Sequence, residues 1–324
     1  MSYQSRFSLT SLSESAAAVV NRCSIFIYTV GYEQRSSYFS DILCNKSAFC
    51  GAFIYEDSTD LGEFKDNLQK FKNNGHTSIG TNIEAMRKSL LIAFENRSLP
   101  RTIVVDISCM DRSLLASLFL TIFEMMNVDD ILHVLYTPNE FSEPDFTFPT
   151  LNYFGPAVPE LNGRVGDFSR ECCLIMGLGY EYGASLNVLE RLEPAVSYLY
   201  LPAGHDDRFL PSVKQANFDF DFGIRNLHFN DFYLANADEA YRDISSIVLA
   251  LKHSMAIALV PFGPKLFSFI CLLVAMENAG DVSFLRYSVN NDRQSSTLKA
   301  SGTTYGVTLS GIERSRWTRA LTNG

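Results

Sequence analysis

Four loops, each following an apolar run, carry the side chains with which this chain could do chemistry. The first, Gly31-Tyr32-Glu33-Gln34-Arg35-Ser36-Ser37, offers a carboxylate, a guanidinium and two hydroxyls at the start of a predicted helix. Unpaired N–H groups and the positive dipole end at such a start suit a phosphate or carboxylate, and Arg35 could hold a phosphate with two donors. The ordinary alternative is that Ser36 or Ser37 caps the helix and Glu33 pairs with Arg35.

The second loop, Asp106-Ile107-Ser108-Cys109-Met110-Asp111-Arg112, also follows a strand and opens a helix. Asp106 at the strand end is a candidate acceptor for a hydroxyl or ribose. Ser108 is a candidate donor to a phosphate or a helix cap. Asp111 fits better as an ordinary helix N-terminal charge. We therefore include Asp106 and Ser108, but not Asp111, in the predicted site.

Two further loops lie in the second half of the chain. Gly179-Tyr180-Glu181-Tyr182-Gly183-Ala184-Ser185 repeats the glycine, tyrosine and glutamate of the first loop but lacks its arginine. Pro261-Phe262-Gly263-Pro264-Lys265 forms a rigid turn that opens another helix. Lys265 interrupts an apolar sequence, where an unpaired amine is costly unless a bound anion neutralises it. The alternative is that Lys265 lies at the surface, where its aliphatic chain covers apolar residues and its amine reaches water.

The predicted ligand-binding residues are Glu33, Arg35, Ser36, Asp106, Ser108, Tyr180, Glu181 and Lys265. Neither a metal site nor a cofactor is predicted, and no catalytic residue can be assigned. His205 with Asp207 would suit general-base chemistry, but no further His or Cys stands at metal-ligand spacing. The motifs GxxxxGK[ST], GxGxxG, GxSxG and HExxH are all missing.

The elements that must position these loops occur in the same order twice. The apolar runs 23–30 and 172–178 each lead into a Gly-Tyr-Glu loop, and each half closes with a strand, a loop, an apolar helix and the strand 131–136 or 282–287. This repetition predicts an α/β fold of two Rossmann-like parallel-sheet halves related by internal duplication. The alternative is one long doubly wound sheet. Loops that follow parallel strands are where such sheets bind ligands.

We predict a first Rossmann-like half over residues 1–140, a linker over 141–168, and a second half with a C-terminal tail over 169–324. The linker prediction rests on a stretch that is rich in Pro, Phe, Asn and acidic residues and has no periodicity. The other predicted helices cover 36–43, 61–71, 81–95, 114–126, 185–192 and 237–253, and the other strands 47–55, 102–105, 195–201 and 256–260.

Composition restricts the class of protein. With 324 residues, 47% of them hydrophobic and 13% aromatic, the chain can bury a substantial core. Its net charge of −9 argues against general nucleic-acid binding and against adsorption to anionic membranes. Seven cysteines without CxxC spacing predict buried free thiols. We expect a cytoplasmic protein without a membrane span.

Two Rossmann-like halves in one chain, with polar loops after their first and later strands, resemble the duplicated CARF and SAVED sensory domains of bacterial antiviral systems. The resemblance covers about residues 22–290 and is one of layout, so no residue is carried over from those families. It implies that a cyclic or linear oligonucleotide signal binds between the halves.

The leading hypothesis is a module that binds or senses a nucleotide-like anion and acts with a partner protein, in bacterial antiviral defence if the resemblance holds. One alternative is a nucleotide- or nucleic-acid-processing enzyme of hydrolase or glycosyl-transfer type, in which Glu33 or Glu181 works with Asp106. Another is a scaffold subunit whose loops are purely structural.

Overall fold

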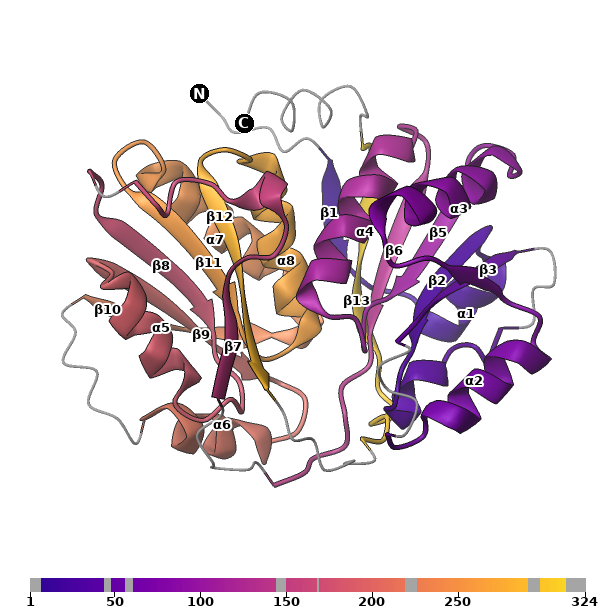
Figure 1. The fold of residues 1–324 in the computed structure, drawn as a ribbon, viewed down its shortest axis with the longest axis horizontal. Coiled ribbons are helices and arrows are strands. Elements are labelled where there is room, and N and C mark those ends of the chain that lie inside the picture. Colours follow the sequence, from indigo (N-terminus) through magenta and orange to yellow (C-terminus); the bar gives the residue numbers. More distant parts are fainter. Residues whose placement is uncertain are drawn as a thin grey trace. The chain divides into compact units, whose positions relative to one another are not determined.

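The computed structural model describes residues 7–43, 48–55, 61–143, 150–167, 169–218, 226–290 and 298–312. The chain divides into two compact units, each built on its own β-sheet (Figure 1). Among the described residues, the first unit holds 7–140 and 298–312, and the second holds 141–290. Two separate sheets confirm the predicted pair of Rossmann-like α/β halves and exclude a single long sheet.

The first sheet has seven strands in the order β1-β13-β6-β5-β2-β3-β4. Its five parallel strands are β2 (Ile25–Val30), β3 (Phe49–Ile54), β4 (Thr77–Ile79), β5 (Thr102–Asp106) and β6 (Ile131–Tyr136). Numbered along the chain, they run 3-2-1-4-5 across the sheet, with β2 beside β5 where the order reverses. Antiparallel pairing adds β13 (Tyr305–Ser310) and β1 (Ser8–Ser11) next to β6.

Helices cover both faces of this sheet. One face carries α1 (Ala16–Arg22) and α2 (Phe64–Asn73), whose apolar side chains pack on alternate residues of β2. The other face carries α3 (Ile83–Glu95) and α4 (Arg112–Met125), which contact each other (Figure 1). The alternation follows from the strand period of two, which sends successive side chains to opposite faces.

The second sheet has the order β10-β9-β8-β11-β12-β7. Its parallel strands are β8 (Cys172–Gly177), β9 (Val196–Ala203), β10 (Leu227–Tyr233), β11 (Ala256–Pro261) and β12 (Val282–Asn290). They again run 3-2-1-4-5, with β8 beside β11 at the reversal. The antiparallel strand β7 (Thr150–Pro156) pairs with β12.

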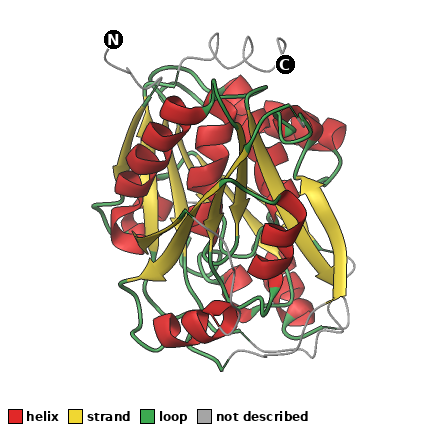
Figure 2. Cartoon of the chain, turned by 90° about the vertical axis from the view of Figure 1, so that its left-hand side faces the viewer, coloured by secondary structure: helices red, strands yellow, loops and turns green. Residues whose placement is uncertain are grey.

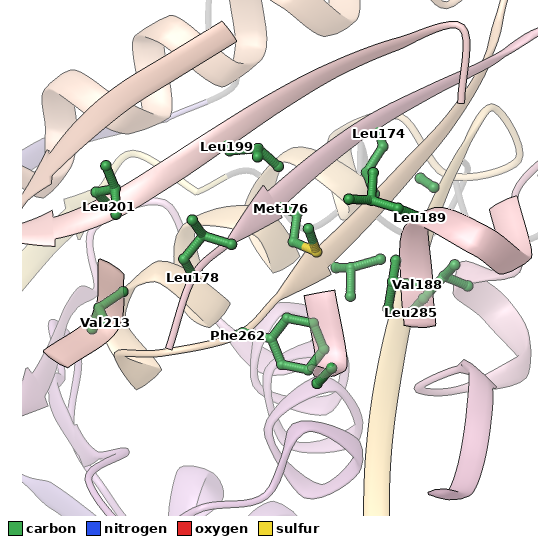
Figure 3. Packing of buried hydrophobic residues seen from close by; sticks show 13 residues of the cluster. Leu174, Met176, Leu178, Val188, Leu189, Leu199, Leu201, Val213, Phe262 and Leu285 are labelled. Atoms are coloured by element: carbon green, nitrogen blue, oxygen red, sulfur yellow. The ribbon is translucent and has the colours of Figure 1, made fainter. Parts of the chain in front are cut away.

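Helices cover the second sheet (Figure 2), and apolar side chains pack between these helices and the strands. On one face, α5 (Ala184–Leu192) and α6 (Phe209–Phe218) pack on β8 and its neighbours, and Figure 3 shows this cluster around Met176, Leu178 and Phe262. The remaining helices are α7 (Ala237–Leu251) and α8 (Lys265–Glu277), and every residue of α8 after the first is buried. None of the helices in the described ranges is long and apolar enough to cross a membrane.

The boundaries between the units differ from those expected. Residues 150–156 of the expected linker form β7 of the second sheet, and residues 305–310 of the expected second half form β13 of the first. β7 is an edge strand, bonded on one side and partly exposed, and β13 lies between β1 and β6 with a mixture of buried and half-buried residues. Neither strand needs a continuous apolar run that a sequence pattern could reveal. Residues 144–149 and 168 of the linker and 313–324 of the tail lie outside the described residues.

Local chemistry explains one missed helix. The expected helix over 36–43 is instead a short 3-10 helix, η1 (Gln34–Ser37), followed by turns. Serine side chains within 36–43 bind nearby backbone groups. For example, Ser40 Oγ donates to the carbonyl of Ser37 at 2.8 Å, and such bonds compete with a regular α-helix. Two further 3-10 helices are η3 (Pro159–Leu161) and η4 (Leu234–Asn236).

Candidate functional site

The predicted site residues form two groups, one in each unit. In both units they come from the loops after the first and fourth parallel strands of the chain order, β2 and β5 or β8 and β11. These strands are neighbours, so their carboxyl ends meet at the point where the strand order reverses. Open α/β sheets bind ligands at this point.

Arg35 is at the centre of the first group. Its Nε donates to Glu33 Oε2 at 2.6 Å, and the two side chains are only 7% and 14% exposed. Its Nη1 donates to the carbonyl of Thr137 at 2.8 Å, and its guanidinium lies 6.0 Å from the centre of the Tyr136 ring. Burial opposes the charge, but the carboxylate of Glu33 raises the pKa of Arg35 above its ordinary value. Arg35 therefore ties the loop after β2 to the end of β6.

Asp106 and Ser108 bind each other in the same unit. Asp106 Oδ1 accepts from the backbone N–H of Ser108 at 2.9 Å and from the Ser108 hydroxyl. Ser108 Oγ in turn accepts from the N–H of Thr137 at 2.8 Å. Burial raises the pKa of Asp106 to about 6, although the hydrogen bonds from Ser108 and the charge of Arg35 act in the opposite direction. These residues join the loop after β5 to the end of β6.

Ser36 stabilises the Gly-Tyr-Glu turn itself. The N–H of Gly31 donates to Ser36 Oγ at 3.2 Å, so this hydroxyl is engaged within its own loop. Asn67, a residue of α2, donates to the carbonyls of Gly31 and Glu33 at 3.0 and 2.9 Å. Asn67 was not predicted, since nothing in a helical asparagine marks it as a partner of a distant turn.

Two further residues of the first group are Cys109 and Asp111. The Cys109 thiol lies 3.6 Å from Glu33 Oε2, and burial together with that carboxylate raises its pKa well above the ordinary value, which disfavours a nucleophilic thiolate. Asp111 caps α4 by accepting from the N–H groups of Ser113 and Leu114 at 2.8 and 2.9 Å. It also accepts from the hydroxyl of Tyr55 at 3.1 Å. Asp111 is therefore structural, as its position suggested.

In the second unit, Tyr180 belongs to an aromatic group that the sequence analysis missed. Its ring stacks on Phe209 with centroids 5.7 Å apart and an angle of 10°. Phe209 also lies 5.8 Å from the His205 ring and 5.4 Å from that of Phe141. The guanidinium of Arg208 covers Phe141 at 4.8 Å. These residues come from three separate loops, so only the folded chain brings them together.

Buried polar atoms without partners are concentrated in the same region. Eight such side-chain atoms occur in the described residues, and three of them belong to Tyr180, Glu181 and Ser185. The Tyr180 hydroxyl lies near Ser212 but makes no hydrogen bond of ordinary geometry. Glu181 Oε2 and Ser185 Oγ have no partner in the described part of the chain, and Ser185 is only 1% exposed. An orphaned buried polar atom calls for a ligand or a water.

Glycines allow the two loops of the second unit to touch. A Cβ on Gly179 would collide with Glu181 Oε2 and lie 2.7 Å from the backbone nitrogen of Gly263. Gly263 itself has φ +70°, which L side chains rarely adopt. Lys265 begins α8 beside this contact and is half-buried. The loop carrying Tyr180 and Glu181 therefore lies directly against the loop that leads to Lys265.

The two units hold their Gly-Tyr-Glu turns by the same contact. Asn217, a residue of α6, donates to the carbonyl of Gly179 at 2.9 Å, as Asn67 of α2 does to that of Gly31. Both asparagines are 2% exposed. The repeat therefore extends beyond the strand order to a buried side chain that supports the turn.

Comparison with known proteins adds no relative. No protein-family model matches the chain, and no curated protein matches its sequence. Function is therefore inferred by comparing the two units of the chain with each other.

Proposed function

We propose that this chain is a nucleotide-binding sensory or interaction module, which binds a nucleotide-like anion in the cytoplasm and acts with a partner protein. The observation that carries the proposal is the pair of orphaned atoms, Glu181 Oε2 and Ser185 Oγ, beside the strand-order reversal of the second sheet. Buried polar atoms at the ligand-binding edge of an α/β sheet are costly unless a ligand satisfies them.

The start of α5 supplies chemistry suited to a phosphate. Gly183 precedes the helix in a left-handed conformation, and no side chain caps it. The first N–H groups of a helix lack intrahelical partners and carry the positive end of its dipole. The buried hydroxyl of Ser185, in the first turn, can donate to the same anion.

The aromatic group supplies chemistry suited to a base. Tyr180 and Phe209 are half-buried and stacked, and the ring of His205 lies beside them. Stacking on aromatic side chains stabilises a bound base by about 1–3 kcal/mol. A phosphate at the start of α5 and a base near Tyr180 would both contact the single loop that joins β8 to α5.

The proposal assigns binding to the second unit, because the charged groups of the first satisfy one another. Arg35 binds Glu33 and the Thr137 carbonyl, and Asp106 binds Ser108. The partner protein and the defence role implied by the CARF and SAVED resemblance belong to the same proposal.

Calorimetric titration with mono-, di- and cyclic oligonucleotides tests the proposal. We expect at least one to bind, and Ser185→Ala to weaken that binding about tenfold through the lost hydrogen bond. Glu190→Gln, an exposed substitution on the same helix, should leave it unchanged. If the wild-type chain binds none of these nucleotides, the proposal is wrong and a scaffold role is favoured.

One observation favours the enzymatic alternative. The pKa of Asp106, raised to about 6 by burial, lies where a carboxyl group can exchange protons near neutral pH. Asp106 is nevertheless buried and bonded to Ser108, so we rank this function second. Incubation with labelled nucleotides and nucleic acids should leave them intact, whereas turnover that Asp106→Asn abolishes would reverse the ranking.

A further inference from the structure

The second unit lacks the cation that the first unit supplies to its own loop. Counted from the first glycine of each Gly-Tyr-Glu turn, Glu33 corresponds to Glu181 and Arg35 to Gly183. The repeated strands agree as well, since Tyr136 is the sixth residue of β6 and Tyr287 the sixth of β12. The second unit thus keeps the carboxylate and the tyrosine but has a glycine in place of the arginine.

In the first unit, the guanidinium of Arg35 fills the space between these groups. It donates to Glu33 Oε2 at 2.6 Å and to the Thr137 carbonyl at 2.8 Å, with the Tyr136 ring 6.0 Å away. This is a flat group that directs one N–H donor, that of Nε, at a carboxylate beside an aromatic ring. A neutral residue in its place would leave Glu33 buried without its ion pair.

In the second unit, the corresponding carboxylate oxygen has no donor. Glu181 Oε2 is buried without a hydrogen-bond partner in the described residues. Arg191 is exposed, and its Nε donates to Asn187 at 2.8 Å. A buried carboxylate oxygen in this condition calls for a donor from outside the described chain, either a water or a ligand.

The second unit has a tyrosine at the position of Tyr136. Tyr287 packs against Phe262 with centroids 5.3 Å apart and belongs to the same apolar cluster as Tyr180, the residue next to Glu181. Burial raises the pKa of Tyr287, while the charge of Arg191 lowers it and that of Glu181 raises it. The loop of Glu181 and the end of β12 therefore share one apolar cluster.

We propose that the second unit binds the guanine base of a nucleotide, whose N1–H and N2–H donate to Glu181, the counterpart of the Glu33 carboxylate that accepts from Arg35 Nε in the first unit. The inference rests on the nucleotide-binding function proposed above. Among the common bases, only guanine presents two N–H donors side by side on a planar edge. Adenine and cytosine place a ring-nitrogen acceptor beside their amino group, and uracil flanks its single N–H with carbonyls, so each would set an acceptor against the carboxylate.

An arginine side chain from another protein has the same donor edge. Guanine is favoured because Ser185, with its orphaned hydroxyl, and the uncapped start of α5 lie four residues along the same loop and suit a phosphate. An arginine side chain would leave that hydroxyl without a partner.

Calorimetric titration of the full chain with GMP, IMP, AMP and methylguanidine tests this assignment. We expect GMP to bind about 10- to 100-fold more tightly than AMP, with IMP weaker than GMP because it lacks the N2 amino group. Glu181→Gln should abolish the preference for GMP over AMP, whereas Glu190→Gln on the same helix should retain it. The comparison of GMP with IMP uses the wild-type chain, so it stands even if Glu181→Gln fails to fold.

The other outcomes are separable. Equal binding of GMP, IMP and AMP would overturn the guanine assignment and leave nucleotide binding intact. Binding of methylguanidine that requires Glu181, without binding of any nucleotide, would overturn the assignment in favour of an arginine ligand. Binding of none of the four would overturn the guanine assignment, and the titration with di- and cyclic oligonucleotides would then decide the proposed function separately.

Discussion

Asn67 and Asn217 hold equivalent backbone carbonyls in the two units, those of Gly31 and Gly179, at 3.0 and 2.9 Å. Each side chain is buried and reaches from the helix after the second parallel strand to the turn after the first. The turn that carries the site residues is thereby attached to a helix instead of depending on its own short sequence.

Substitution of either asparagine by alanine should destabilise its unit. Each change leaves a buried carbonyl without its donor, at a cost of about 1–3 kcal/mol in the free energy of unfolding. Urea unfolding of Asn67→Ala and Asn217→Ala measures this loss. Asn73→Ala, at an exposed bond from Gln69, is the control and should lose much less. Equal losses at all three positions would contradict the supporting role.

Arg35→Met should be strongly destabilising, because it leaves the carboxylate of Glu33 buried without its ion pair. The expected loss in the free energy of unfolding is about 3–5 kcal/mol. Arg22→Met is the matched control, since Arg22 pairs with Glu14 while both side chains are nearly half exposed. If urea unfolding shows similar losses for the two variants, Arg35 does not tie the loop to the sheet as its contacts indicate.

Asp106 should make stability fall as the pH rises between about 4 and 6. Burial raises its pKa in the folded chain from 3.8 to about 6, so the folded state holds the proton more tightly than the unfolded state does. The contribution of Asp106 to the free energy of unfolding is therefore greatest below pH 4 and is lost as the pH rises through 6. The total loss is about 3 kcal/mol.

Asp106→Asn has no carboxyl group that titrates at this position. The difference in the free energy of unfolding between this variant and the wild type therefore measures the pH-dependent contribution of Asp106. Relative to the wild type, the variant should gain stability steadily from pH 4 to pH 6 and then remain level in urea unfolding. Asp66→Asn on the exposed face of α2 controls for the substitution itself. A difference between Asp106→Asn and wild type that does not vary with pH would refute the raised pKa.

Gly263→Ala should cost more than Gly75→Ala, although the two glycines have similar backbone angles of φ +70° and +66°. The conformational strain of alanine, about 1–2 kcal/mol, is common to both. A Cβ on Gly263 would in addition collide with the carbonyl oxygen of Leu178, whereas nothing lies within 4 Å at Gly75. Thermal unfolding compares them, and equal shifts would show that the loops after β8 and β11 do not touch as described.

Elements with continuous apolar runs were predicted well. β2, β5, β8 and β11 lie within or near their expected bounds, as does the enclosed helix α4, and the enclosed helix α8 begins at Lys265 as expected. Central parallel strands are buried on both faces, so their sequences are apolar throughout and easily recognised. The strands β7 and β13 at the sheet margins lack this signal, and only their pairing with β12 and β6 reveals their place.

The binding role of the candidate site stays a prediction, but one of its contacts was expected from the sequence as the alternative interpretation. Glu33 does pair with Arg35, and Asp106 separately binds Ser108, at the end of the first sheet. The unpartnered buried atoms of Glu181 and Ser185 could not be predicted from the sequence. Whether a buried atom has a hydrogen-bond partner depends on which distant residues the fold brings next to it.

The sequence alone thus determined that the chain has two α/β halves with repeated Gly-Tyr-Glu loops, since strand and helix periodicity are local properties. The tertiary structure decided which of the two loops keeps a buried carboxylate oxygen without a hydrogen-bond donor. Arg35 reaches the Thr137 carbonyl 102 residues away only because β2, β5 and β6 pair in that order. Glu181 Oε2, with Gly183 in the arginine's place, meets no such partner in the described residues. Hydrogen bonds between distant segments depend on strand pairing, which no local pattern encodes.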